Sequence, residues 1–178
     1  ILTSIKDKPL SFEVFSDDFL EMERQALEIA SWGDNVYVKI PVTNTNQETC
    51  YELVNNLTAK KVKVNVTALM TLTQVRDVTA ALNPEVPSYV SVFAGRIADT
   101  GVDPVPIMQK ALDLLNKAPN AELLWASPRE VFNVYQAESI GCHIITATND
   151  ILKKLNLKAK DLTEYSQETV QMFFNDAK

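Results

Sequence analysis

Short apolar runs alternate along this chain with longer segments of helical periodicity. The runs cover residues 10–15, 36–41, 62–67, 89–94, 122–127 and 142–147. Each run is rich in β-branched or aromatic residues and ends in a small or polar residue, which is typical of buried β-strands. After the first run, Phe19, Met22, Ala26 and Ile29 recur at helical spacing. The pattern therefore predicts repeated strand–helix units.

Two of the predicted helices carry a start signal. Thr71-Leu-Thr-Gln74 and Ser127-Pro-Arg-Glu130 both fit the capping box, in which a hydroxyl and a side chain three residues later satisfy free backbone N–H groups. The second also has proline in the favoured first helical position. We therefore expect helices to begin at Thr71 and Ser127.

Regular strand–helix alternation predicts a parallel sheet, either doubly wound and open or closed as a barrel. No glycine-rich phosphate fingerprint follows any run, and the chain has four glycines, which weakens the doubly wound nucleotide-binding alternative. The favoured prediction is one α/β domain over residues 1–178, a (β/α)8 TIM barrel lacking two of the usual eight units. Residues 149–155 and 162–174 predict two further helices. The last of these carries Phe173 and Phe174 and docks either on its own barrel or on a neighbouring subunit.

Composition narrows the class of protein. A length of 178 residues fits one domain with a sizeable core, and a net charge of −6 argues against a nucleic-acid partner, which needs a basic stripe. No apolar run approaches the roughly 18 residues of a membrane span, and no signal-like segment opens the chain. These features predict a cytoplasmic protein. The first residue is not methionine, so we expect the sequence to start within a longer product.

The cysteines and the histidine offer little chemistry. Cys50 and Cys142 have no metal-ligand spacing and no disulfide framework, so both read as small buried hydrophobes. His143 is the only histidine, and its apolar neighbours favour packing in the core or at its rim. We therefore expect no metal and no cofactor.

Lys39 stands in the middle of the apolar strand Asn35–Thr43, where it is either on a solvated face or buried for its chemistry. Other polar residues lie at or just after the ends of consecutive predicted strands: Glu13, Thr67, Ser91, Arg96, Ser127 and Arg129. The active sites of (β/α) barrels lie at the carboxyl ends of the strands, so these side chains are expected to surround a single opening of the barrel.

The combination suggests a phosphorylated carbonyl substrate. Desolvation and a nearby cation disfavour the ammonium form of a lysine and leave an amine that attacks a carbonyl, so that a carbon–carbon bond breaks through an imine without a metal. Two arginines, a serine and the expected helix start at Ser127 suit a phosphate group.

Five segments of the chain resemble the small-subunit transaldolase family, which also contains the fructose-6-phosphate aldolases. They are V-Y-V-K-I-P-V-T, V-K-V-N-V-T-A-L-M-T-L-T-Q, Y-V-S-V-F-A-G-R-I-A-D-T-G, W-A-S-P-R-E-V and I-G-C-H-I-I-T-A-T-N-D-I-L. They occur in the family's order over nearly the whole chain. The resemblance implies a class I aldolase barrel, no cofactor, and homo-oligomers built as rings of five or doubled rings.

The resemblance also implies a role for each strand-end residue. Lys39 matches the Schiff-base lysine, while Glu13 and Thr67 match the pair that holds a catalytic water. Among the substrate contacts, Ser91 matches the residue that lines the wall beside the sugar, and Phe93 matches the aromatic residue beside the lysine. Arg96, Ser127 and Arg129 match the residues that bind the phosphate.

Two positions favour transaldolase within this family. The aldolases carry Gln and Tyr where this chain has Glu13 and Phe93. The implied reaction moves a dihydroxyacetone unit from sedoheptulose 7-phosphate or fructose 6-phosphate to an aldose phosphate, in the pentose phosphate pathway. Two alternatives stay open: an aldolase that uses free dihydroxyacetone and glyceraldehyde 3-phosphate, and an inactive or merely phosphosugar-binding fragment.

One departure from the family pattern is large. The family begins with a strand bearing an aspartate in L-D-T and a second strand ending in T-T-N-P, and neither occurs in residues 1–178. The aspartate is the family's main acid/base for the sugar hydroxyl. We therefore expect the 178-residue polypeptide alone to have negligible turnover, because acid/base catalysis contributes on the order of 10² to 10⁴-fold.

Overall fold

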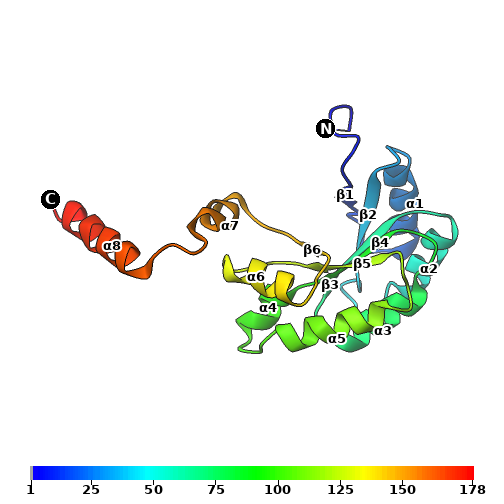
Figure 1. Cartoon of the computed structure of the whole chain (residues 1–178). Helices are drawn as coiled ribbons and strands as arrows, with labels where there is room; N and C mark the ends of the chain where they lie inside the picture. Colours follow the sequence, from blue (N-terminus) through cyan, green and yellow to red (C-terminus); the bar gives the residue numbers. More distant parts are fainter. Residues whose placement is uncertain (1) are drawn as a thin grey trace. The chain divides into compact units, whose positions relative to one another are not determined.

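A six-stranded parallel sheet forms the centre of the structure, a computed structural model that describes residues 2–178. Neighbouring strands in the sheet follow chain order, from β1 at one edge to β6 at the other (Figure 1). The strands are β1 (Leu10–Glu13), β2 (Val36–Pro41), β3 (Val64–Leu69), β4 (Ser88–Val92), β5 (Ala121–Trp125) and β6 (Ile144–Ile145). Each adjacent pair is parallel, as the alternation of strands and helices predicts.

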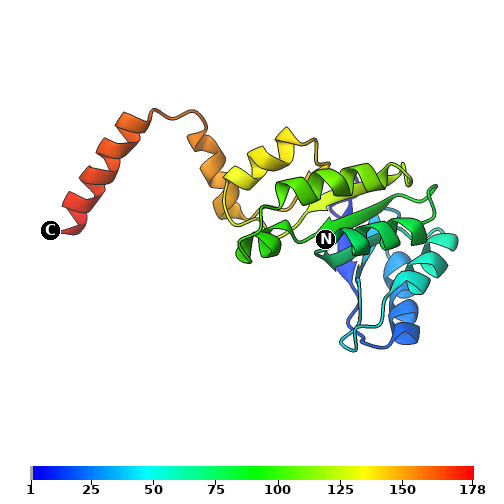
Figure 2. The ribbon, with the colours of Figure 1, turned by 90° about the horizontal axis from the view of Figure 1, so that it is seen from below.

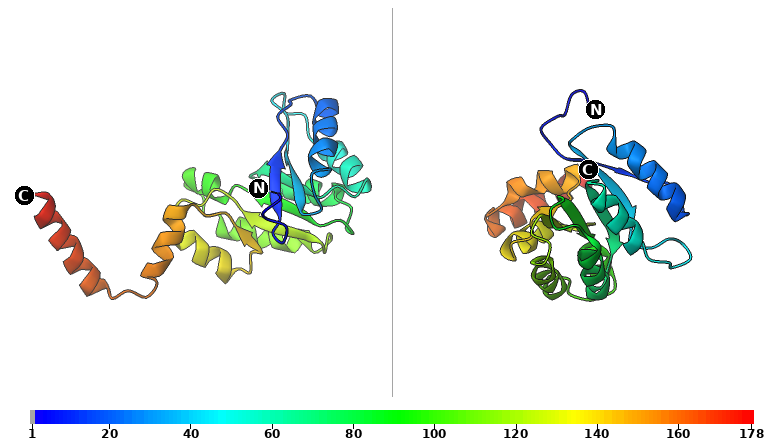
Figure 3. Two further views of the ribbon diagram at one scale, coloured as in Figure 1. Left: turned by 90° about the horizontal axis from the view of Figure 1, so that it is seen from above. Right: turned by 90° about the vertical axis from the view of Figure 1, so that its right-hand side faces the viewer.

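Helices connect the strands and lie together on one side of the sheet. They are α1 (Phe19–Ala30), α2 (Tyr51–Ala59), α3 (Leu72–Ala81), α4 (Ala94–Asp99), α5 (Val105–Leu115) and α6 (Phe132–Ser139). Figures 2 and 3 show α1, α2, α3 and α5 following one another around the outside of the curled sheet. Because α4 is short, α3 packs against α5 rather than α4.

This order confirms an incomplete (β/α) barrel. A doubly wound sheet reverses its strand order at a switch point, and here the order does not reverse. Within residues 2–178 the sheet has six strands and does not close on itself. The bounds of all six predicted strands hold to within two residues, and the sixth is the shortest, reduced to Ile144 and Ile145.

The two faces of the sheet differ in chemistry. Val38, Ile40 and Val66 are fully buried on the outer face, within the core that the helices cover. Burial of an aliphatic side chain of this size contributes about 1.5–3 kcal/mol. On the inner face, Tyr37 and Tyr89 stack with their ring centroids 4.1 Å apart. Tyr37 is two residues before Lys39 on β2, so the stack lies on the same face as Lys39 and one step nearer the amino ends of the strands.

The helix starts were predicted with mixed success. Thr71 forms the full capping box with Gln74 at the start of α3, which confirms that prediction. The prediction at Ser127 is wrong. Ser127 adopts a left-handed backbone conformation with φ of 61°, and α6 begins only at Phe132. The proline after Ser127 disfavours a right-handed conformation at the preceding residue, so the chain turns before the helix starts.

Of the two cysteines and the histidine, only Cys50 is buried as the sequence predicts. Cys50 is fully buried before α2, and burial raises the pKa of its thiol to about 12. Cys142 is partly buried, and burial also raises its pKa. His143 is exposed, against the prediction that it packs in the core or at its rim, and its Nδ1 atom accepts a hydrogen bond from the backbone N–H of Leu123 at 2.9 Å.

Residues Ala147–Lys178 form a second compact unit, separate from Ile1–Thr146. It contains α7 (Asn149–Lys154), the short 3₁₀ helix η1 (Leu155–Leu157) and α8 (Leu162–Asp176). Asp161 caps α8 by accepting from the N–H groups of Thr163 and Glu164. No residue of α8 is buried. The docking of Phe173 and Phe174, the homo-oligomeric state and the assignment of residues 1–178 to one domain all stay predictions. No helix within residues 2–178 has the length and apolarity to cross a membrane.

Candidate active site

Lys39 and Glu13 meet on the inner face of the sheet. They are directly paired in the register of β1 and β2, and the Nζ atom of Lys39 lies 3.3 Å from Oε2 of Glu13. The Lys39 side chain is 32% exposed, so it is neither in bulk water nor sealed in the core. The neighbouring charge is a carboxylate rather than the cation expected from the sequence. This arrangement gives the amine a group that exchanges protons within hydrogen-bond reach.

A chain of polar side chains crosses the inner face beside this pair. Ser91 donates to Oδ1 of Asn65 at 2.6 Å, and Nδ2 of Asn65 donates to the hydroxyl of Ser11 at 3.1 Å. Asn65 also pairs in register with Lys39. Asn65 and Ser91 are both buried. Asn65 therefore fixes the Ser91 hydroxyl and joins β4 to β1 at the level of the lysine.

Sequence reasoning missed Asn65. The signal was present, because a buried strand rarely carries an amide between two valines, as V-N-V does here, without a polar partner. Its period-two relation to Thr67 places both side chains on the same face.

Thr67 is buried with an unused hydroxyl. It is 3% exposed, and within the described residues its Oγ1 has no hydrogen-bond partner. The register of β3 shifts just after it, between Val66 and Leu69, and Ala68 has a φ of 64°. An unpaired buried hydroxyl costs about 1–3 kcal/mol, so this one is set to bond a ligand or a water. That is the chemistry expected of Thr67.

Arg129 and Arg96 gather around one carboxylate after strands β5 and β4. Arg129 forms a two-pronged ion pair with Asp99, in which Nε donates to Oδ1 at 2.9 Å and Nη2 to Oδ2. Arg96 lies over the ring of Phe93, with 5.6 Å between its Cζ atom and the ring centroid. Both arginines are exposed.

A close backbone approach brings the loop of Ser127 and Arg129 onto α4. A Cβ atom on Gly95 would stand 1.5 Å from the carbonyl oxygen of Ser127, so only glycine fits there. Asn133 then fixes the end of the loop, since its Oδ1 accepts from the N–H groups of Arg129 and Glu130 at 2.7 and 3.1 Å. The structure thus brings together the predicted phosphate residues, although no helix starts at Ser127.

The Asp99–Arg129 pair predicts a specific acid response. The hydrogen bond from Arg129, aided by the charge of Arg96, lowers the pKa of Asp99 from its ordinary value of 3.8. A lowered pKa in the folded state means that the pair stabilises the fold above pH 3.8 and that this contribution is lost as pH falls through the lower folded value. We expect an NMR titration of the Asp99 carboxyl to show this lowered pKa. An Arg129→Met variant should return it to its ordinary value, and an unchanged titration would contradict the pairing.

The candidate site therefore spans five neighbouring strands. Lys39 and Glu13 lie at β2 and β1, Thr67 and Ser91 lie on β3 and β4, and the arginines follow β4 and β5. Within residues 2–178, His, Cys, Asp and Glu side chains form no group of three that could hold a metal ion. A groove of about 420 Å³ lies elsewhere, between α3 and α5, and none of its lining residues belongs to the predicted site.

Comparison with known proteins gives a consistent picture. A profile of the family described as "Transaldolase/Fructose-6-phosphate aldolase" matches residues 1–178. A "Probable transaldolase" of Thermoanaerobacter sp. (strain X514) is 34% identical over 155 residues, which are 86% of this chain and 68% of that protein. "Probable transaldolase 2" of Listeria monocytogenes is 35% identical over 157 residues, covering 86% of this chain and 67% of the relative. A "Probable transaldolase" of Nitrosopumilus maritimus is 32% identical over 156 residues, with the same coverage.

Proposed function

This chain belongs to the transaldolase/fructose-6-phosphate aldolase family, and on that premise we propose that it is a transaldolase acting through an imine on Lys39. The observation that carries the proposal is the pairing of Lys39 with Glu13 at 3.3 Å on the inner face, at the carboxyl ends of the strands. Residues at the carboxyl ends of barrel strands line the active site, whereas a lysine that only increases solubility is expected on the outer surface of the helices. The substrates are phosphorylated sugars, sedoheptulose 7-phosphate or fructose 6-phosphate.

The reaction begins when the amine of Lys39 adds to the C2 ketone. Water leaves, and a protonated imine remains. A base takes the proton of the C4 hydroxyl, the C3–C4 bond breaks, and its electron pair moves into the imine to give an enamine. The aldose phosphate departs, and a second aldose phosphate accepts the three-carbon unit before water releases the product and the amine. The family's aspartate base has no counterpart within residues 1–178.

Glu13 and Thr67 are proposed to hold the water that carries protons to and from the imine. The Glu13 carboxylate already contacts the Lys39 nitrogen, and the Thr67 hydroxyl is buried with its bonding capacity unused among the described residues. Proton transfer of this kind contributes on the order of 10² to 10⁴-fold to the rate. Ser91 is proposed to contact the sugar, with Asn65 fixing its orientation.

The phosphate is proposed to bind between Arg96, Arg129 and Ser127. Asp99 occupies two of the donors of Arg129, and the remaining N–H groups stay available to a phosphate oxygen. The carboxylate holds the guanidinium plane in one orientation, which reduces the entropy lost when the phosphate binds. Arg96 supplies the second positive charge.

Phe93 and Glu13 favour transaldolase over aldolase. Phenylalanine has no hydroxyl to hold a water near the enamine, so the three-carbon unit waits for an aldehyde acceptor. An assay with free dihydroxyacetone and glyceraldehyde 3-phosphate separates the two reactions. Accumulation of fructose 6-phosphate from these two compounds would assign the aldolase reaction instead.

Trapping tests the imine directly. Borohydride reduces an imine irreversibly, so incubation with fructose 6-phosphate and borohydride should add ketose-derived mass to one peptide, the one that contains Lys39. The matched control is Lys63, whose ammonium donates to the Asp34 carbonyl oxygen at 2.6 Å and should carry no adduct. Turnover in the intact protein without an adduct at Lys39 would rule out the proposed mechanism.

A further inference from the structure

The chain leaves the barrel mouth directly after Glu13, at a turn that a helix side chain holds in place. The N–H of Val14 still pairs with the carbonyl of Lys39 at 3.1 Å, in continuation of the strand. The next two N–H groups, those of Phe15 and Ser16, have no strand to pair with and both donate to Oε1 of Gln25, at 2.8 and 3.3 Å. Gln25 lies on α1, two turns into the helix.

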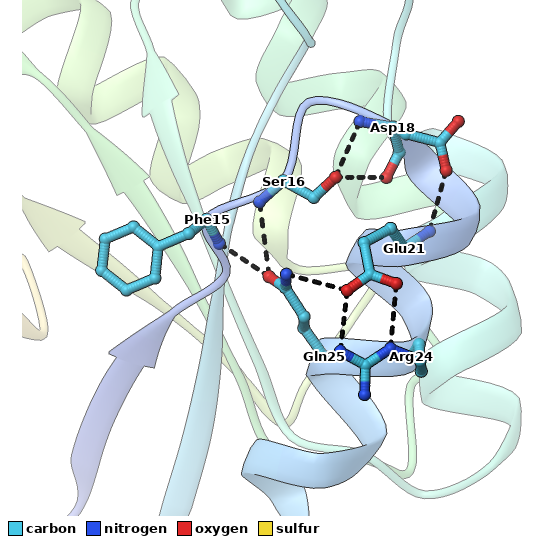
Figure 4. Close-up of polar contacts among 6 residues, drawn as sticks. All are labelled: Phe15, Ser16, Asp18, Glu21, Arg24 and Gln25. Atoms are coloured by element: carbon cyan, nitrogen blue, oxygen red, sulfur yellow. Dashed lines mark hydrogen bonds and ion pairs between the residues drawn. The ribbon is translucent and has the colours of Figure 1, made fainter.

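The orientation of the Gln25 amide is fixed from its other end. Its Nε2 atom donates to Oε1 of Glu21 at 3.1 Å, and Glu21 accepts from Nε and Nη2 of Arg24 at 2.9 and 2.7 Å. Figure 4 shows this arrangement, with the Phe15 ring turned away from α1. The oxygen must face the two N–H groups and the nitrogen must face the carboxylate, so the amide has one satisfactory orientation.

Two further hydrogen bonds stabilise the same turn at the start of α1. Ser16 Oγ accepts from the N–H of Asp18 at 3.0 Å, and Asp18 Oδ1 accepts from the N–H of Glu21 at 2.9 Å. Phe15 is 93% exposed, so burial of its side chain does not hold the turn. Hydrogen bonds to α1 therefore hold it, and Gln25 satisfies the two N–H groups nearest to the end of the strand.

We propose that Gln25 is a positioning residue for Glu13, and this rests on the proposed function of Glu13 at the Lys39 imine. Strand β1 ends beside β2, with Glu13 opposite Lys39 in the pairing. Glu13 is its last residue and has an exposed side chain, so packing does not fix the carboxylate. Without the two hydrogen bonds to Gln25, the strand frays from Val14 inward and the carboxylate of Glu13 moves away from Lys39.

The test replaces Gln25 by methionine, which keeps the length of the side chain and removes its hydrogen bonds. The rate of borohydride trapping at Lys39 should fall by on the order of 10-fold to 10²-fold, because small displacements of a catalytic group have effects of this size. The amide hydrogens of Phe15 and Ser16 should exchange faster. Gln171→Met is the matched control, since Gln171 makes one exposed contact on α8, and it should change neither readout.

A rescue experiment separates positioning from general stability. Gln25→Glu places a second carboxylate at the 3.1 Å contact with Glu21 and should slow trapping at neutral pH. The double variant Glu21→Gln/Gln25→Glu exchanges the two groups, restores one donor and one acceptor, and should recover most of the rate. A purely structural role would lower the melting temperature of these variants without such recovery of the rate.

A double-variant cycle with Glu13 makes the inference falsifiable. Glu13→Gln should slow trapping by itself, and Gln25→Met should add little in that background, because it acts through Glu13. Full trapping by Glu13→Gln would overturn the proposed role of Glu13 itself, and the inference with it. Two outcomes would overturn the inference alone, provided that Glu13→Gln slows trapping. One is an unchanged trapping rate in Gln25→Met, and the other is a double variant in which the two losses add.

Discussion

Replacement of Lys39 by methionine will abolish the borohydride-stable sugar adduct and lower turnover of the protein that carries this chain by on the order of 10⁵ to 10⁶-fold, the scale seen when an enzyme loses its nucleophile. The reason is chemical: methionine cannot form the imine, and without the imine the three-carbon unit has no electron sink. Mass spectrometry after borohydride treatment measures the first effect, and a coupled assay for the released aldose phosphate measures the second.

Lys39→Arg is the matched control for charge. Arginine keeps a cation beside the Glu13 carboxylate and preserves the ion pair, but its guanidinium does not form an imine. Both variants should therefore lose the adduct, while Lys39→Arg should keep more of the thermal stability. Substantial turnover by Lys39→Arg would show that Lys39 acts through its charge and not through a covalent bond.

Gly95→Ala will displace the loop of Ser127 and Arg129 and destabilise the protein by about 3 kcal/mol or more, the upper range for forced overpacking. The added Cβ would stand 1.5 Å from the Ser127 carbonyl oxygen and 2.6 Å from its carbon. These are backbone atoms, so no side-chain rotation relieves the clash. The loop must move away from α4, and Arg129 moves with it. Urea unfolding measures the stability, and the Michaelis constant for the sugar phosphate measures the displaced arginine.

Gly33→Ala gives the comparison. Its Cβ would meet a side-chain atom, Oδ1 of Asn35, at 3.2 Å, so a shift of a few tenths of an ångström in a side chain, and no backbone movement, relieves the contact. We expect a change in stability within about 0.5 kcal/mol, as for an ordinary surface substitution. Similar losses for both variants would mean that glycine at position 95 reflects backbone flexibility and not the close approach of the loop.

The architecture was predictable from the sequence because both periodicities are clear. Strand β2 matches its predicted bounds, and α1 buries Met22, Ala26 and Ile29 as the helical spacing requires. Boundaries were less predictable where tertiary contacts decide them. The start of α6 is the example: the sequence at Ser127 fits a capping box, but the contact of its carbonyl with Gly95 and the proline that follows it hold the residue in a left-handed turn.

The candidate site was predictable as a set of strand ends but not as a set of contacts. Strand order brings Glu13 to Lys39, and this pairing follows from the register of β1 and β2. The partnership of Arg129 with Asp99 joins a loop residue to the last residue of α4, and the loop has no periodicity from which to infer it. Gln25 was missed for the same reason, because this amide shows its role only once its partners are in place.

The stacked pair of Tyr37 and Tyr89 limits how this scaffold can be redesigned. The rings are 7% and 6% exposed, and the ammonium of Lys63 lies 5.7 Å from the centroid of Tyr37. Together they seal the inner face on the side of Lys39 that is remote from the mouth. Longer or bulkier sugars therefore gain no depth in this direction. A redesign for new donors has to widen the rim, at the turns after β1, β4 and β5, and leave the two rings untouched.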